Sequence, residues 1–126
     1  HLFYTPTLAG ELQVDARAPI DQQPTLEAAT NGIPIVNITA PTPAGVSRNT
    51  FAEYHVDTAG IILNNNPSIQ PEDLNANKSY LINEPLFPND NLQGRAAEVI
   101  LTEVTGVHTT ELLGPTEIYG RSADFI

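Results

Sequence analysis

Histidines and carboxylates are the residues of this chain with the widest chemical use. The chain has three histidines, His1, His55 and His108, and no cysteine. Histidines hold a metal ion or move protons when a second ligand or a proton partner lies at a suitable spacing. No two of them have the four-residue spacing of a helical zinc site. We therefore expect hydrogen-bonded or surface imidazoles, with no metal site, no cofactor and no catalytic residue.

Two pairs of glutamates lie near one another in the sequence, Glu98 with Glu103 and Glu111 with Glu117. Paired carboxylates can cleave a glycosidic bond as acid and base or nucleophile. Sugar-cleaving β-helix enzymes also need a basic residue near their carboxylates, and this chain has five lysines and arginines in total. The segment Asn89-Asp90-Asn91 resembles part of a calcium loop, but no acidic ligand follows it, which favours a turn. The sequence therefore predicts that the protein is not an enzyme, and a β-helix hydrolase is the minor alternative.

Composition excludes several classes of partner. The formal net charge is −10, whereas nucleic-acid binding and adhesion to anionic lipid both require clustered Lys and Arg. No apolar run approaches the ~20 residues of a membrane span, so no membrane insertion is expected. At 40% apolar residues the chain can bury a core. Charged residues make up 16%, against about 25% in typical proteins, and many positions are Asn, Thr, Pro or Gly. That mixture favours short strands and polar turns over helices.

Short segments that are apolar, or that alternate apolar and polar residues, lie between turn residues and predict strands. These strands would position the histidines, carboxylates and amides. A segment that fits one helical turn or a loop lies at residues 25–29, and Pro34 should open a strand over residues 33–39. That strand should place Ile33 and Ile35 on one face and Val36 and Ile38 on the other. The remaining predicted strands cover residues 2–4, 11–15, 46–56, 61–63, 80–82, 115–120 and 123–126. Residues 95–106 fit either a helical stripe or a strand, and we favour the strand because Thr102, Val104 and Thr105 are poor helix formers together.

Residues 45–66 contain two of these strands, the turn residue Gly60, and a run of three asparagines. Asn side chains carry two donors and an acceptor, which suits a corner where amides of stacked chain segments pair. We predict that Asn49, Asn64 and Asn65 form a structural amide ladder. Strand-and-corner units recur at intervals of roughly 20 residues, which is typical of a parallel solenoid. A β-sandwich also has many short strands and is the competing architecture.

Three separated segments resemble the two-partner secretion (TPS) domain of filamentous haemagglutinin and contact-dependent inhibition exoproteins. The first runs from Gly45 through Asn49, Phe51 and Gly60 to Asn65, the second is residues 101–106, and the third is residues 113–124. Their common order over residues 33–126 makes the resemblance specific. The family signature Asn-Pro-Asn-Leu aligns with Asn89-Asp90-Asn91-Leu92, where Asp90 replaces the proline. His55 stands where the family usually has Asn.

The resemblance implies an all-β, right-handed parallel β-helix with an N-terminal cap. Residues 1–126 would be a single domain, with the cap at 1–32 and the β-helix coils at 33–126. The family domain is about twice this length, so the chain is expected to be a truncated solenoid that can self-associate through its open end.

The resemblance also implies export from a Gram-negative bacterium through the periplasm to the cell surface or medium. The module would be recognised by the periplasmic domains of a dedicated outer-membrane transporter and would nucleate folding of the β-helix that follows. Residues Asn89, Asp90, Asn91 and Leu92 would then be the turn offered to the transporter. The alternative is a surface adhesin module that binds a host glycan or protein directly, with Tyr54, Tyr80 and Tyr119 as platforms.

Overall fold

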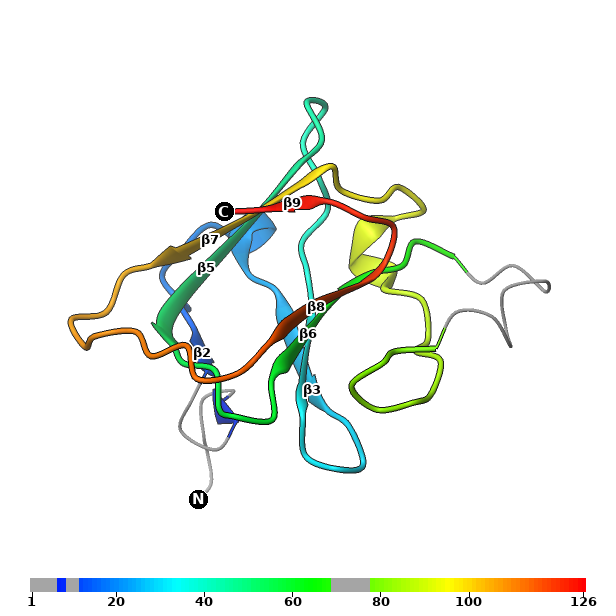
Figure 1. Ribbon diagram of the computed structural model, residues 1–126. Coiled ribbons are helices and arrows are strands. Elements are labelled where there is room, and N and C mark those ends of the chain that lie inside the picture. Colours follow the sequence, from blue (N-terminus) through cyan, green and yellow to red (C-terminus); the bar gives the residue numbers. More distant parts are fainter. Residues whose placement is uncertain (1–6, 9–11, 69–77) are drawn as a thin grey trace, which may run out of the picture.

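Short strands account for nearly all of the regular secondary structure. The computed structural model describes residues 7–8, 12–68 and 78–126 (Figure 1). The strands are β1 (Thr7–Leu8), β2 (Leu12–Val14), β3 (Thr25–Ala28), β4 (Pro34–Asn37), β5 (Val46–Tyr54), β6 (Ile61–Asn65), β7 (Val99–Val104), β8 (Thr116–Gly120) and β9 (Asp124–Phe125). Two 3-10 turns, η1 (Ile20–Gln22) and η3 (Asp90–Leu92), are the helical elements of the described residues. The prediction of an all-β chain is thus confirmed. None of the helical elements in these ranges is long and apolar enough to cross a membrane.

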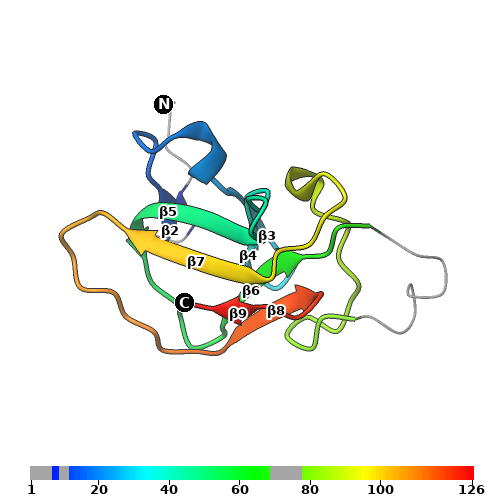
Figure 2. The same cartoon turned by 90° about the horizontal axis from the view of Figure 1, so that it is seen from above.

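The strands form two sheets, and the chain alternates between them. One sheet has the order β1-β2-β5-β7-β9 and the other β3-β4-β6-β8. From β4 onward, successive strands lie in alternate sheets, and each strand from β4 to β7 pairs in parallel with the second strand after it. Figure 2 shows β5 and β7 running side by side above β6 and β8. On the N-terminal side, β2 and β3 pair antiparallel with β5 and β4.

The main core lies between the two sheets. Val36 and Ile38 point into it from one sheet and Phe51 and Ile100 from the other, and each is at most 1% exposed. The other buried members of this core are Leu12, Val14, Tyr54, Val56, Ile61, Leu63, Leu92 and Ala97. Burial of this apolar surface is the main favourable term for a small β-domain.

A second apolar cluster covers the outer face of the β3-β4-β6-β8 sheet. Ile33, Ile35, Ile62 and Tyr119 are buried there, against Leu81, Ile82 and Leu86 of the long connection between β6 and β7. The division of residues 33–38 between two faces, Ile33 and Ile35 against Val36 and Ile38, is as the sequence predicts. Strand β4 is therefore buried on both faces, which accounts for its unbroken apolar character.

Two predictions of local structure were wrong. Residues 25–28 form strand β3, where all four residues pair in register with β4. Backbone pairing to an edge of the sheet outweighs the helix propensity of Leu, Glu and Ala there. Residues 80–82 form a turn, because the N–H groups of Tyr80 and Leu81 donate to the Glu117 carboxylate and cannot join a ladder. The strand predicted at residues 2–4 lies outside the described residues.

Gly60 forms the predicted turn between β5 and β6. Its φ is +102°, in the left-handed region that glycine adopts without steric cost. A Cβ at this position would lie 2.7 Å from the carbonyl oxygen of Pro115. Glycine is therefore required both by the turn and by the approach of the segment that leads into β8.

Candidate functional site

Side-chain amides at the ends of β4 and β6 form a direct pair. Asn37 and Asn64 occupy register-matched positions on these parallel strands. Asn64 Nδ2 donates to Asn37 Oδ1 at 3.0 Å and to the carbonyl oxygen of Phe87 at 3.0 Å. Both asparagines are at most 9% exposed. The amide of Asn64 therefore joins two strands and fastens the long connection to them.

Asn65 points to the opposite side of β6 and bonds to backbone. Its Nδ2 donates to the carbonyl oxygens of Ala97 at 3.0 Å and Arg121 at 2.9 Å, and its Oδ1 accepts from the N–H of Ala97 at 2.8 Å. The side chain is fully buried. One amide thus ties the end of β6 to the segment before β7 and to the segment after β8.

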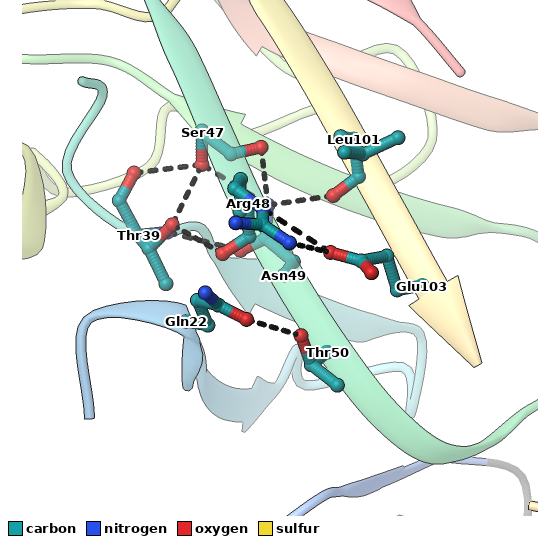
Figure 3. Close-up of polar contacts among 8 residues, drawn as sticks. All are labelled: Gln22, Thr39, Ser47, Arg48, Asn49, Thr50, Leu101 and Glu103. Atoms are coloured by element: carbon teal, nitrogen blue, oxygen red, sulfur yellow. Dashed lines mark hydrogen bonds and ion pairs between the residues drawn. The ribbon is translucent and has the colours of Figure 1, made fainter. Parts of the chain in front are cut away.

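Asn49 lies within β5 of the other sheet, where its side chain also bonds to neighbouring segments (Figure 3). Its Oδ1 accepts from the N–H of Thr39 at 3.0 Å, and its Nδ2 donates to Ser47 Oγ at 3.0 Å. The Thr39 and Ser47 hydroxyls lie 3.0 Å apart and complete this buried network. Asn49 also reaches the carbonyl oxygen of Leu101 on β7 at 3.4 Å.

The three predicted ladder residues are all buried and hydrogen-bonded, but they do not stack on one another. Asn49 lies in one sheet, and Asn64 and Asn65 face opposite sides of a strand in the other. Asn64 meets the side-chain amide of Asn37, which lies in the strand predicted over residues 33–39 but was not among the predicted ladder residues. A signal was present, because Asn37 ends β4 as Asn64 ends the apolar run of β6.

The tetrapeptide 89–92 is held mostly inside the fold. Asn89 Nδ2 donates to the carbonyl oxygens of Ile38 and Asn64, both at 2.9 Å, and Asn89 Oδ1 caps η3 through the N–H of Asn91 at 3.0 Å. Asn89 is 2% exposed and Leu92 is 1% exposed. The amide of Asn91 is also engaged, by the carbonyl oxygen of Asn37 at 3.0 Å. Asp90 is the exposed member of the four.

Glu53 is bonded to two histidines beside the end of β5. Its oxygens lie 2.9 Å from His55 Nε2 and 2.6 Å from His108 Nδ1. The hydrogen bond from His108, followed by that from His55, holds the pKa of Glu53 below its ordinary value. His55 Nδ1 accepts the N–H of Glu111 at 3.2 Å, so its Nε2 carries the proton given to Glu53. These contacts fasten the loop after β7 to β5.

Two other titratable groups have pKa values shifted by their surroundings. The N–H of Arg17 and then the hydroxyl of Thr105 donate to Asp15 and lower its pKa. Burial raises the pKa of Tyr54 to about 12. Among the described residues its buried hydroxyl has no hydrogen-bond partner.

One glutamate from each of the two pairs that lie near one another in the sequence makes structural contacts. Glu103 forms an ion pair with Arg48 at 2.9 Å (Figure 3). The Glu117 carboxylate accepts from Ser79 Oγ at 2.7 Å and from two backbone N–H groups. No group of three or more His, Asp or Glu side chains within the described ranges could hold a metal ion. The buried polar groups of the described residues thus join chain segments to one another.

A family model described as the TPS secretion domain matches residues 11–126. This chain belongs to the TPS secretion domain family. A crystal structure of the filamentous hemagglutinin secretion domain is similar, with a TM-score of 0.73 and 32% identity over 91% of this chain and 34% of that chain. The family resemblance inferred from the three sequence segments is confirmed.

Curated relatives of this TPS chain are large toxins and haemolysins. It is 37% identical over 112 residues to a Toxin CdiA of Yersinia pestis, covering 89% of this chain and 3% of that protein. It is 37% identical over 103 residues to a Hemolysin of Serratia marcescens, covering 82% of this chain and 6% of that protein. The chain thus spans only a few per cent of the curated relatives that it matches, and their toxic activities are named for the whole proteins.

Proposed function

We propose that this TPS chain is the secretion-targeting module of a large exported adhesin or toxin-carrying exoprotein of a Gram-negative bacterium. The periplasmic domains of a dedicated outer-membrane transporter would recognise it and commit the exoprotein to the cell surface or medium. The observation that carries this proposal is the family match across residues 11–126. The buried, mutually bonded polar groups also fit a module that acts by being bound, without chemistry of its own.

We further propose that the strands form a right-handed parallel β-helix. Each strand from β4 to β7 pairs in parallel with the second strand after it in the same sheet, and such parallel crossovers are right-handed in about 98% of cases. Residues 1–32 would act as the cap, since β2 and β3 run antiparallel to the first stacked strands. Strands β8 and β9 would provide the template on which further β-helix folds.

The edges of the two sheets at β8 and β9 support the proposal that the isolated chain self-associates. Leu112, Leu113, Phe125 and Ile126 lie at or beside the last strands and are between 40% and 68% exposed. Apolar side chains next to unpaired strand edges favour pairing with another chain. Sedimentation should show the associated fraction growing with protein concentration, and a concentration-independent monomer would contradict this.

Recognition through residues 89–92 is proposed in a narrower form. The side chains of Asn89 and Leu92 are buried, so a transporter could contact only Asp90 and the half-exposed Asn91 without unfolding the turn. We infer that Asn89 and Leu92 act by holding the fold. Asp90→Ala tests direct contact, because the exposed Asp90 side chain is not held by a bond to any other described part of the chain.

The proposal is tested by secretion of a full-length exoprotein that carries this chain, expressed with its transporter. Deletion of residues 11–126 should abolish the secreted product while leaving the exoprotein in the cells. Replacement by an unrelated β-domain of similar size is the matched control and should not restore secretion. Secretion at the normal level after the deletion would refute the proposal.

One observation keeps the adhesin alternative in view. Tyr54 and Tyr119 are buried and cannot act as binding platforms, but Tyr80 is 67% exposed and Phe87 is 85% exposed. Exposed aromatic rings are typical of carbohydrate and protein contact sites. Binding of the purified chain on a glycan array, lost in Tyr80→Ala, would support this second function.

A further inference from the structure

A groove with an apolar floor lies on the outer face of the β3-β4-β6-β8 sheet. One wall is the end of β3 and the turn after it, residues 27–30, and the other is residues 82–87 of the connection between β6 and β7. The backbones of these two segments can be followed in Figure 1, near the lower end of β3. Ile35, Ile82 and Leu86 contribute apolar lining, and the volume is about 190 Å³. Small-molecule sites usually have about 300–1,000 Å³, so this groove fits one long side chain better than a cofactor.

The second wall of the groove is fixed by bonds to the sheet. The carbonyl oxygen of Phe87 accepts from Asn64 Nδ2 at 3.0 Å, and the N–H of Leu86 donates to the Tyr119 hydroxyl at 3.1 Å. The N–H of Ser79 donates to the carbonyl oxygen of Glu84 at 2.8 Å and closes the preceding turn. A wall held in this way loses little conformational freedom when a ligand binds.

The two walls carry one exposed carboxylate each, Glu27 and Glu84. Glu27 Oε2 accepts from the Asn37 amide, and this contact orients the carboxylate without neutralising it. No lysine or arginine of the described chain lines the groove. Arg48 is paired with Glu103, and Arg95 donates to two backbone carbonyls elsewhere. Within a chain of net charge −10, the groove therefore has no internal cation to balance it.

An aromatic ring completes the lining. Phe87 belongs to the groove yet is 85% exposed. A cation over the face of such a ring is attracted to it, and the aliphatic stem of Lys or Arg packs well on apolar surface while its charged head stays in water. The apolar floor, the aromatic ring and the two carboxylates therefore all suit a long side chain that ends in a cation.

We propose that this groove binds a lysine or arginine side chain presented by an extended, basic segment of a protein partner. The stem of that side chain lies on Ile82 and Leu86, and its cationic head meets Glu27, Glu84 and the ring of Phe87. This interaction site is additional to the secretion role and does not depend on it.

The test is binding of a fluorescein-labelled heptapeptide of alternating lysine and threonine to the purified chain, followed by anisotropy at low salt. We expect saturable binding that weakens as salt is added, and none by the same peptide with glutamate for lysine. Glu27→Gln and Glu84→Gln should each weaken the lysine peptide roughly two- to fivefold, the range expected of exposed ion pairs. Gln at position 27 still accepts from Asn37, so the fold is retained, which near-ultraviolet circular dichroism verifies.

Glu111→Gln is the matched control, since Glu111 is an exposed glutamate beside Val56, outside the groove. It should change the affinity less than twofold. Equal weakening by Glu111→Gln would mean nonspecific attraction to an acidic surface and would overturn the proposal. Absence of lysine-peptide binding to the unchanged chain would also overturn it, as would full affinity in the Glu27→Gln, Glu84→Gln double variant. Because no transporter is present, failure here and failure of the secretion experiment are separate results.

Discussion

Asn89 makes contacts that should give its substitution a large effect on stability. Its side chain joins the carbonyl oxygens at the ends of β4 and β6 and caps η3, and it is 2% exposed. Asn89→Ala removes these three hydrogen bonds and leaves two buried carbonyl oxygens short of a donor. At a net value of about 1 kcal/mol for each bond, the expected loss is ~3 kcal/mol, and more if the carbonyl groups stay dry. Small domains have a total stability of about 5–15 kcal/mol, so this is a substantial fraction.

Two variants separate this structural role from a surface role. Asn89→Asp keeps the Oδ1 acceptor but places an oxygen against two carbonyl oxygens at the 2.9 Å contacts, so it should destabilise at least as much as Asn89→Ala near neutral pH. Asp90→Ala changes the exposed neighbour and should stay within about 0.5 kcal/mol of the unchanged chain. Urea unfolding followed by circular dichroism gives the free energy of unfolding for all three. If Asn89→Ala also fell within 0.5 kcal/mol, the assignment of Asn89 as a buried bridge would be refuted.

Three further predictions concern buried or paired side chains. Asn65→Ala should lower the free energy of unfolding by about 2–4 kcal/mol in urea titrations, because three buried bonds are lost, whereas Asn66→Ala should have little effect. Tyr54→Phe should leave that free energy unchanged or raise it, since it removes a buried hydroxyl that lacks a partner among the described residues, and a tyrosine titrating near pH 12 should disappear from the absorbance curve. The pKa of Glu53 in the folded chain lies below its ordinary value of 4.5. The ionised carboxylate therefore stabilises the fold above pH 4.5, and this stabilisation is lost as the pH falls through the folded pKa. The stability difference between the chain and Glu53→Gln should therefore shrink in urea titrations below about pH 4.5, and a difference that grew with acid would contradict the histidine contacts.

Strand positions followed from local sequence where apolar pattern and turn residues agreed. Pro34, the alternating faces of β4 and the turn at Gly60 were all predictable, since each depends on backbone chemistry within a few residues. Residues 25–28 and 80–82 were not, because their structure is decided by partners distant in the sequence. Pairing with β4 makes the first a strand, and the Glu117 carboxylate holds the second as a turn.

The polar groups show the same limit. The sequence marked Asn49, Asn64 and Asn65 as structural, but it could not show that Asn64 meets Asn37 or that the other two bond to backbone. The turn at residues 89–92 looked exposed because it is polar and short. Asn89 and Leu92 are buried because the connection between β6 and β7 folds back over the ends of β4 and β6. A local sequence pattern cannot predict such a long-range contact.

We have proposed that a transporter recognises this folded TPS chain itself. The most direct measurement is binding of the purified chain to the purified periplasmic domains of its two-partner secretion transporter, by surface plasmon resonance, with Asp90→Ala and an unrelated β-domain as comparisons. We expect saturable binding of the chain, weaker binding of Asp90→Ala, and no binding of the unrelated domain. A correctly folded chain that fails to bind, while the full-length exoprotein is still secreted through that transporter, would contradict it.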